Sequence, residues 1–209
     1  MTMAVQWTDQ EHSDESFEDA DLSDAQLRGC QFTRCSFRHT RLVDATTEAC
    51  VFSECDFTGA HLGGSTHRRS AFLTCRFHLA GLFTARFEGC KMTGATFQDA
   101  SLAGLTVQGG DWSYVDLQKQ NLKGQDFRKV RLVEANLSES SLERADLRDA
   151  DLTGANLSHA KLRGADLRGA TLSRVDIREL NLTGVRLDVA QAVMLARAHG
   201  AKVDFDDSL

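Results

Sequence analysis

Apolar residues recur at every fifth position of the chain from Phe17 to Leu187, without a slip in register. Of these 35 positions, 33 hold Leu, Phe, Met, Ile, Val or Trp, and the two exceptions are Thr47 and His67. A small residue, most often Ala, Cys or Ser, usually lies two positions before each apolar centre. Neither the 3.6-residue period of an α-helix nor the two-residue period of a strand keeps this spacing on one side. The pattern therefore predicts a repeat architecture with a five-residue unit.

A five-residue unit can form one side of a four-sided coil, with the apolar and the small residue both pointing inward. Twenty residues then complete one coil, and successive coils stack through main-chain hydrogen bonds as parallel strands do. Twelve of the 16 glycines lie two residues after a centre, where a turn needs a permissive backbone. The absence of proline agrees with ladders that use every N–H. The sequence thus predicts an all-β parallel β-helix, a rod roughly 42 Å long at about 4.8 Å per coil.

We name each side of the coil after its central residue in one turn: the Leu27, Phe32, Phe37 and Leu42 sides. Aromatic centres dominate the first half of the rod and Leu the second. Leu105 and Leu180 are too large for their small slots, and Gln120 and Gln125 are polar in theirs, so we expect local distortion with ladder-like amide bonding there.

Four segments follow from where the register starts and stops: an acidic, partly irregular start (1–16), the β-helix (17–187), a C-terminal helix (188–200) and a tail (201–209). Asp188 can cap the helix and Gly200 can end it. Its apolar surface is wider than one stripe, which predicts contact with both the last coil and a second subunit. The predicted dimer interface comprises Val189, Val193, Met194, Leu195 and Ala196.

The residue types that could carry chemistry occupy structural positions of the repeat. All six cysteines occupy the small slot, so we expect buried thiols and no metal site. Thr47 and His67 are expected to form a buried hydrogen-bonded pair, in preference to a catalytic base. The sequence lacks a nucleophile elbow, a Gly-rich phosphate loop and zinc spacing, so we expect no enzyme activity and no cofactor.

The charge balance disfavours one class of partner, nucleic acids. With 24 basic and 30 acidic residues, the chain has a formal net charge of −6, which argues against direct nucleic-acid binding. The sequence has no apolar run long enough to span a membrane and no signal peptide, so a cytoplasmic protein is expected.

Outward charges are segregated by side. The Phe37 side carries eight acidic and four basic residues, and the Phe32 side six and four, whereas the Leu27 side is predicted to be basic. A row of anions at coil spacing can imitate a line of phosphates, although solvated faces also carry charge without function. The candidate partner-binding residues are Asp56, Asp99, Asp116, Glu139, Asp176 and Glu179 on the Phe37 side, and Glu54, Asp111, Glu134 and Asp151 on the Phe32 side.

The chain resembles the pentapeptide-repeat proteins, and among them the MfpA-like fluoroquinolone-resistance proteins, which are related to Qnr. The likeness lies in FSECDF (52–57), HRRSAF (67–72), ADLRGA (165–170) and AQAVMLARAHG (190–200). It implies a right-handed quadrilateral β-helix that dimerises through its C-terminal helix, mimics DNA and binds DNA gyrase, protecting that topoisomerase from quinolones. Two alternatives stay open: a scaffolding solenoid for another cytosolic protein, and a self-immunity protein of an antibiotic producer.

Overall fold

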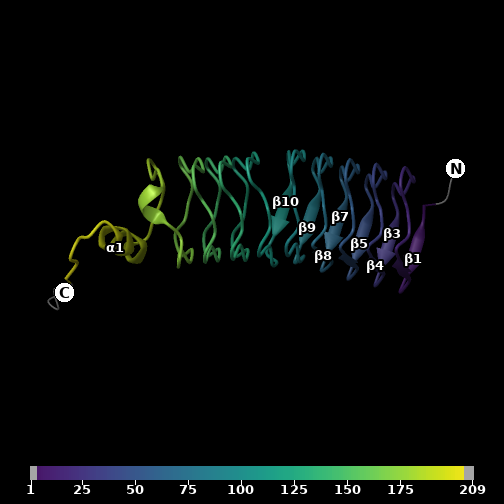
Figure 1. The fold of residues 1–209 in the computed structure, drawn as a ribbon, viewed down its shortest axis with the longest axis horizontal. Coiled ribbons are helices and arrows are strands. Elements are labelled where there is room, and N and C mark those ends of the chain that lie inside the picture. The colour runs from purple at the N-terminus through teal and green to yellow at the C-terminus, as the bar shows by residue number, and fades with distance from the viewer. Residues whose placement is uncertain (1–3, 205–209) are drawn as a thin grey trace.

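In the computed structural model, which describes residues 4–204, the chain forms a rod of stacked four-sided coils (Figure 1). The described part therefore begins inside the predicted N-terminal segment. Residues 205–209, most of the predicted tail, lie outside it. Within 4–204, no helix is both long and apolar enough to cross a membrane.

Short strands mark two sides of the coil, and each pairs in parallel with the strand 20 residues further on. Leu27 lies beside Thr47, and Phe32 beside Phe52, which confirms the predicted 20-residue coil. Isolated parallel bridges such as Ser36 to Asp56 join the other sides. The strands of the Leu27 side are β1 (Gln6–Thr8), β3 (Gln26–Arg28), β5 (Thr46–Glu48), β7 (Thr66–Arg68), β9 (Arg86–Glu88) and β10 (Thr106–Gln108). Those of the Phe32 side are β2 (Glu11–Ser13), β4 (Gln31–Thr33), β6 (Val51–Ser53) and β8 (Ala71–Leu73).

The stack begins before residue 17, because β1 and β2 already pair with the next coil. Trp7 and His12 take the places of apolar centres there and lie half-buried against the first phenylalanines. The described start of the chain is therefore more regular than its sequence predicts, because the rings of Trp7 and His12 pack against the first phenylalanines and hold this coil on the stack.

The interior is filled by columns of side chains stacked one coil apart. Phe37 and Phe57 stack with ring centroids 4.8 Å apart, and Phe52 and Phe72 with centroids 4.7 Å apart, which confirms the aromatic first half. All six cysteines are buried, as predicted, and each thiol donates to a backbone carbonyl. Burial raises the pKa of Cys50 and of Cys90 to about 11, so both remain neutral thiols.

His67 lies fully buried in this core and is hydrogen-bonded at both ring nitrogens. Its Nδ1 lies 2.9 Å from Thr47 Oγ1, which confirms the predicted pair, and its Nε2 lies 3.0 Å from Ser65 Oγ. Thr47 Oγ1 also contacts Ser70 Oγ at 2.9 Å. Burial lowers the pKa of His67 to about 3, so the ring is a neutral structural group.

The twelve glycines predicted at turns all have positive φ, from 61° at Gly89 to 75° at Gly164. Other residues adopt the same conformation at equivalent positions, such as Asp44 with φ 56°. Each coil therefore turns two residues after its centre whether or not glycine is present, and side chains there project from an edge of the rod.

The predicted distortions are confirmed. The ladder of the Leu27 side ends at β10, and the coils beside it stand further apart (Figure 1). Gln120 Nε2 donates to the carbonyl of Phe97 at 2.7 Å, and Gln125 Nε2 to that of Leu105 at 2.8 Å. Buried Gln120 and half-buried Gln125 thus bond to backbone carbonyls and not to one another, so the prediction of ladder-like amide bonding is wrong.

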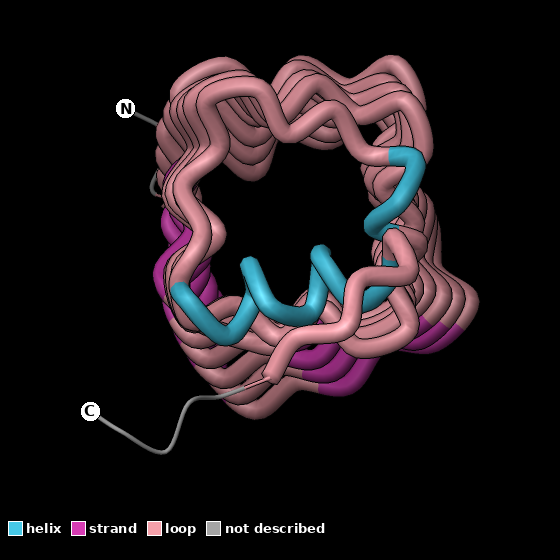
Figure 2. The backbone as a smooth tube through the Cα atoms, turned by 90° about the vertical axis from the view of Figure 1, so that its left-hand side faces the viewer, coloured by secondary structure: helices cyan, strands magenta, loops and turns pink. Residues whose placement is uncertain are grey.

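Near the C-terminal end, the residues before Leu180 form a 3-10 helix, η1 (Ile177–Glu179), in place of a regular side. The helix α1 (Val189–Ala198) follows, and Asp188 caps it in a capping box with Gln191. Viewed along the rod, α1 lies along one side of the end (Figure 2). The apolar centres Leu182 and Leu187 are only half-buried there.

Candidate functional site

The ten predicted partner-binding carboxylates occupy two positions of the repeat. Asp56, Asp111, Asp116, Asp151 and Asp176 come directly before an apolar centre, and all but Asp176 are half-buried. Glu54, Asp99, Glu134, Glu139 and Glu179 come two residues after a centre, and all but Glu134 are exposed. The two groups differ in what else they bind, which decides their availability to a partner.

Carboxylates before a centre cap the following turn. Asp56 Oδ1 accepts from the N–H of Thr58 at 3.0 Å, and Asp111 Oδ1 accepts from that of Ser113 at the same distance. Partial burial opposes ionisation of Asp56, yet the hydrogen bonds from Thr58 and the positive charges of Arg76 and Arg38 hold its pKa below the usual value. Part of the hydrogen-bonding capacity of these aspartates is therefore used within the rod.

Most of the predicted carboxylates also have a cation close by. On the Phe32 side, Arg131 lies 3.2 Å from Asp111 and 3.8 Å from Asp151. Glu134 pairs with Arg174 at 2.8 Å. The Phe32 side is therefore largely neutralised and is a weaker candidate than its sequence predicts.

Asp56 and Asp176, on the Phe37 side, each lie 3.4 Å from an arginine, Arg38 and Arg178 respectively. Within residues 4–204, Glu54, Asp116 and Glu179 have no ion pair. Asp99 lies 4.0 Å from the ring of His78, and Glu139 lies 3.8 Å from exposed Lys119, a distance at which an exposed pair gains little.

The strongest anionic feature is thus a line we call the acidic edge, defined by Asp99, Glu139 and Glu179 at the turn from the Phe37 side to the Leu42 side, with Asp116 beside it. Successive members of the line are 40 residues, or two coils, apart, which corresponds to roughly 9.6 Å along the rod. Lys119 and His159 occupy this line in the coils between them. Asp99 and Glu139 are held at regular turns with φ of 54° and 58°, whereas Glu179 lies in η1.

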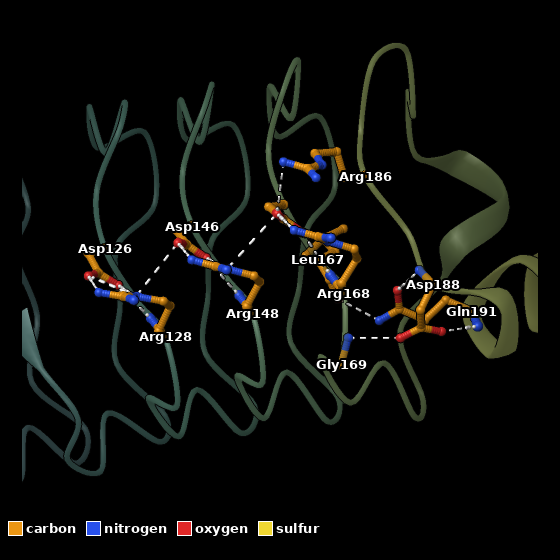
Figure 3. Close-up of polar contacts among 11 residues, drawn as sticks. Asp126, Arg128, Asp146, Arg148, Leu167, Arg168, Gly169, Arg186, Asp188 and Gln191 are labelled. Atoms are coloured by element: carbon orange, nitrogen blue, oxygen red, sulfur yellow. Dashed lines mark hydrogen bonds and ion pairs between the residues drawn. The ribbon is translucent and has the colours of Figure 1, made fainter.

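The Leu27 side differs from its predicted basic character. Arg148 binds Asp146 through two hydrogen bonds of 2.9 and 2.6 Å, and lies 4.0 Å from Asp166 of the next coil. The same Asp-x-Arg arrangement recurs at 126–128 and 166–168, which produces a ladder of alternating charges (Figure 3). Hydrogen bonding to Arg168 lowers the pKa of Asp166 to about 2. Counting charges by side missed this ladder, although the recurring Asp-x-Arg triplet is its signal.

The five predicted dimer residues lie on α1. Val189 is 78% exposed, and Val193, Met194, Leu195 and Ala196 are half-buried. Sequence reasoning missed Gln191, which is buried and donates to the carbonyl of Leu167 at 2.6 Å (Figure 3) and to that of Ala170 at 2.9 Å. The helix is therefore anchored to the last regular coil by polar contacts, and Met194 and Leu195 also pack against the core of their own chain, whereas Val189 stays exposed.

Comparison with known proteins supports the repeat and the fold. The model of the family described as pentapeptide repeats matches residues 16–46, 113–149 and 150–188, with eight copies. Two trypsin-treated, substituted forms of QnrB1, a plasmid-mediated fluoroquinolone resistance protein, match in structure. The first is 22% identical over 96% of this chain and 100% of its own, with a TM-score of 0.66; the second is 23% identical over 94% and 99%, with 0.64.

Full-length QnrB1 is 20% identical over 94% of this chain and 100% of its own, with a TM-score of 0.58. No curated protein matches the chain in sequence at a significant level. The structural matches show the shared β-helix, and the closer likeness to MfpA stays a prediction.

Proposed function

The chain belongs to the pentapeptide-repeat family, and from its acidic edge we propose that it is a DNA-mimicking protein that binds DNA gyrase. In this proposal the rod occupies the DNA-binding surface of the topoisomerase and protects the enzyme from quinolones. The protein then acts in the cytoplasm by binding, without catalysis. The fold that it shares with a fluoroquinolone resistance protein supports this assignment.

The observation that carries the proposal is the acidic edge. Asp99 is exposed at a regular turn and Glu179 at the end of η1, and neither has a partner arginine or lysine among residues 4–204. A basic DNA-binding groove attracts such a line of fixed anions, and the attraction is largest where the charges are not already neutralised.

Charge density limits how far the mimicry is electrostatic. Eight acidic residues on the Phe37 side are spread over roughly 42 Å, or one per about 5 Å, whereas duplex DNA carries one charge per about 1.7 Å. The rod thus has about a third of the charge density of DNA before its own cations are counted. Shape complementarity must supply the remaining affinity, and the salt dependence of binding should be weaker than that of DNA.

The experiment is a gyrase supercoiling assay, with and without a quinolone, at micromolar protein. The wild-type chain should inhibit supercoiling or reduce quinolone-stabilised cleavage. The double reversal Asp99→Lys with Glu179→Lys should lose at least tenfold in potency, because it changes the edge by four charges.

The chain offers a matched control in Asp9 and Asp149, which lie at the same turn position on the diagonally opposite edge of the coil. Asp9→Lys with Asp149→Lys makes the same change in net charge and should preserve potency. Equal losses in the two variants would reduce the effect to net charge, and no effect of wild-type protein on gyrase would refute the proposal.

A scaffolding role is the second candidate, and a specific observation favours it. Leu79 and Phe83 are 59% and 62% exposed on a rod whose other large apolar side chains are mostly buried. Exposed aromatic residues are common anchors of protein interfaces. Capture of one other protein, with no topoisomerase recovered and with loss on Phe83→Ser, would favour this role.

The proposed assembly is a homodimer joined through α1. The exposed Val189 of the helix and the half-buried Leu182 at the end of the stack provide the apolar surface proposed for a second copy, while Leu187 and Met194 pack against the core of their own chain. Covering this end would also protect the terminal coil from further association.

A further inference from the structure

The main-chain ladder opens between the coil that contains Leu102 and the coil that contains Leu122. In most of the rod each centre and the residue two positions on donate to the next coil, as Leu82 does to the carbonyl of Ser101 at 2.9 Å and Thr84 to that of Ala103 at 3.0 Å. A second interruption lies beside η1, where Leu157 and Leu162 make no such bond among the described residues. Among the described residues, no equivalent bonds leave Leu102 or Gly104, and no bridge joins Ser101 to Asn121.

The opening, which we call the wedge, is bounded at both ends. The two coils are still joined where Phe97 donates to the carbonyl of Asp116 at 3.1 Å, and again where Trp112 donates to that of Arg131 at 2.7 Å. Between these points, both lips of the wedge carry backbone donors and acceptors that have no partner in the described part of the chain. Such edges are templates for pairing with another strand.

The wedge is built into the sequence. Leu105, Gln120 and Gln125 stand in slots that elsewhere hold Ala, Cys or Ser, and their bulk holds the coils apart. Gln125 replaces one lost ladder bond by donating to the carbonyl of Leu105, to which Asp126 makes no bond in the described part of the chain, and Gln120 donates to the carbonyl of Phe97, which also accepts from Ala100. The interior stays closed, because Leu102 and Leu105 are buried and Phe127 is fully buried.

A polar cleft of about 800 Å³ lies at this wedge on the Phe37 and Leu42 sides. Its lining includes the carboxylates of Asp99 and Asp116 and a single cation, Lys119. One coil away lie the exposed Leu79 and Phe83: Leu79 donates to the carbonyl of Gln98 at 3.0 Å, so it stacks directly against the lining.

We propose that this cleft binds an extended segment of a partner protein as an added strand. The backbone of the segment pairs with Leu102 and Gly104 on one lip or with Asn121 on the other, as in other cases of strand addition. A Lys or Arg side chain of the segment meets Asp99 and Asp116, and an apolar side chain covers Leu79 and Phe83. The site does not depend on gyrase being the partner.

The test uses synthetic octapeptides, blocked at both ends, each with one Lys or Arg and one Leu or Phe at varied spacing. Their counterparts carry Glu in place of the basic residue. Fluorescence anisotropy should find basic peptides that bind at least tenfold more tightly than their counterparts. Bound peptide should slow amide exchange at Leu102, Gly104 or Asn121, but not at Leu82 and Thr84, which are already paired.

Two variants separate the cleft from other binding. Leu105→Ala with Gln120→Ala and Gln125→Ala restores small slots, closes the wedge and leaves the acidic edge intact, so peptide affinity should fall at least tenfold while gyrase inhibition persists. Asp99→Lys, at an exposed turn, should reverse the preference for basic peptides. Peptides that bind the closed variant as well as wild type, or no preference for basic peptides, would overturn the proposal.

Discussion

Replacing His67 with Phe should remove a defined part of the acid sensitivity of the fold. His67 lies between Thr47 and Ser65 in the core and stacks on Phe87 with ring centroids 4.7 Å apart. Phenylalanine therefore continues an existing aromatic column. Thr47 retains its contact with Ser70, and Ser65 retains its bond to the carbonyl of Leu62, so the substitution leaves no hydroxyl without a partner.

The magnitude follows from the pKa of His67, which is about 3 in the folded protein and about 6.5 in an unfolded chain. Above pH 6.5 the group is neutral in both states and adds no pH dependence. Below pH 6.5 the unfolded state binds a proton that the folded state does not, so the free energy of unfolding falls until pH 3. At about 1.4 kcal/mol per pH unit, the loss between pH 7.5 and 4.5 is roughly 2.7 kcal/mol.

The assay is denaturant unfolding of wild type and His67→Phe at pH 7.5 and 4.5. The variant should differ from wild type by less than about 1.5 kcal/mol at pH 7.5 and should lose roughly 2.7 kcal/mol less on acidification. Solenoids can unfold in parts, so amide exchange in β5 and β7 should show the same difference. His159→Phe, at an exposed turn, is the control. An unchanged pH dependence in His67→Phe would refute the reasoning.

Three further predictions concern the turn geometry, the ion-pair ladder and the dimer. Gly110→Ala should destabilise the protein by more than about 2 kcal/mol in denaturant unfolding, because φ is 97° and a Cβ would lie 2.2 Å from the carbonyl oxygen of Cys90. Gly124→Ala, with open space around the added Cβ, should cost only about 1 kcal/mol. Equal costs for the two variants would contradict this prediction. Asp166→Asn keeps the turn cap but removes a charge that contacts three arginines, so the thermal midpoint should fall more than for the more exposed Asp126→Asn. The stability that the Asp166 charge contributes is present above about pH 4 and is lost as the pH falls through 2. A difference in thermal midpoint between wild type and Asp166→Asn that persists at pH 2 would contradict the prediction. Val189→Glu, at an exposed position of α1, should shift the protein toward monomer in sedimentation velocity. Ala192→Glu, also exposed on α1 but outside the predicted interface, should not. An unaltered dimer in Val189→Glu would remove this residue from the interface.

The fold could be predicted from the sequence because one short period controls it. Each five-residue unit repeats the same inward pair and the same turn, so an error in predicting one unit does not shift the prediction for the next. The sites of distortion were also readable, since Leu105 and Leu180 exceed the volume that their slots allow.

The availability of the charged residues could not be predicted in the same way. Whether Glu134 or Asp99 is free depends on which arginine reaches it from a neighbouring coil, and that depends on side-chain geometry two coils away in the case of Arg174. The opened ladder beside β10 also depends on three-dimensional geometry. The size of the side chains in the small slots predicts which coils are distorted, but only the structure shows which sides separate and which stay joined.

The central claim, that the rod takes the place of DNA on gyrase, is tested most directly by competition. A fluorescent DNA duplex bound to gyrase is titrated with the wild-type protein and with Asp99→Lys, Glu179→Lys, and anisotropy follows the duplex. We expect wild type to displace the duplex fully, with an apparent affinity that falls in proportion to the DNA concentration. The variant should displace the duplex at least tenfold more weakly. Binding of the protein to gyrase while the duplex stays bound would contradict it.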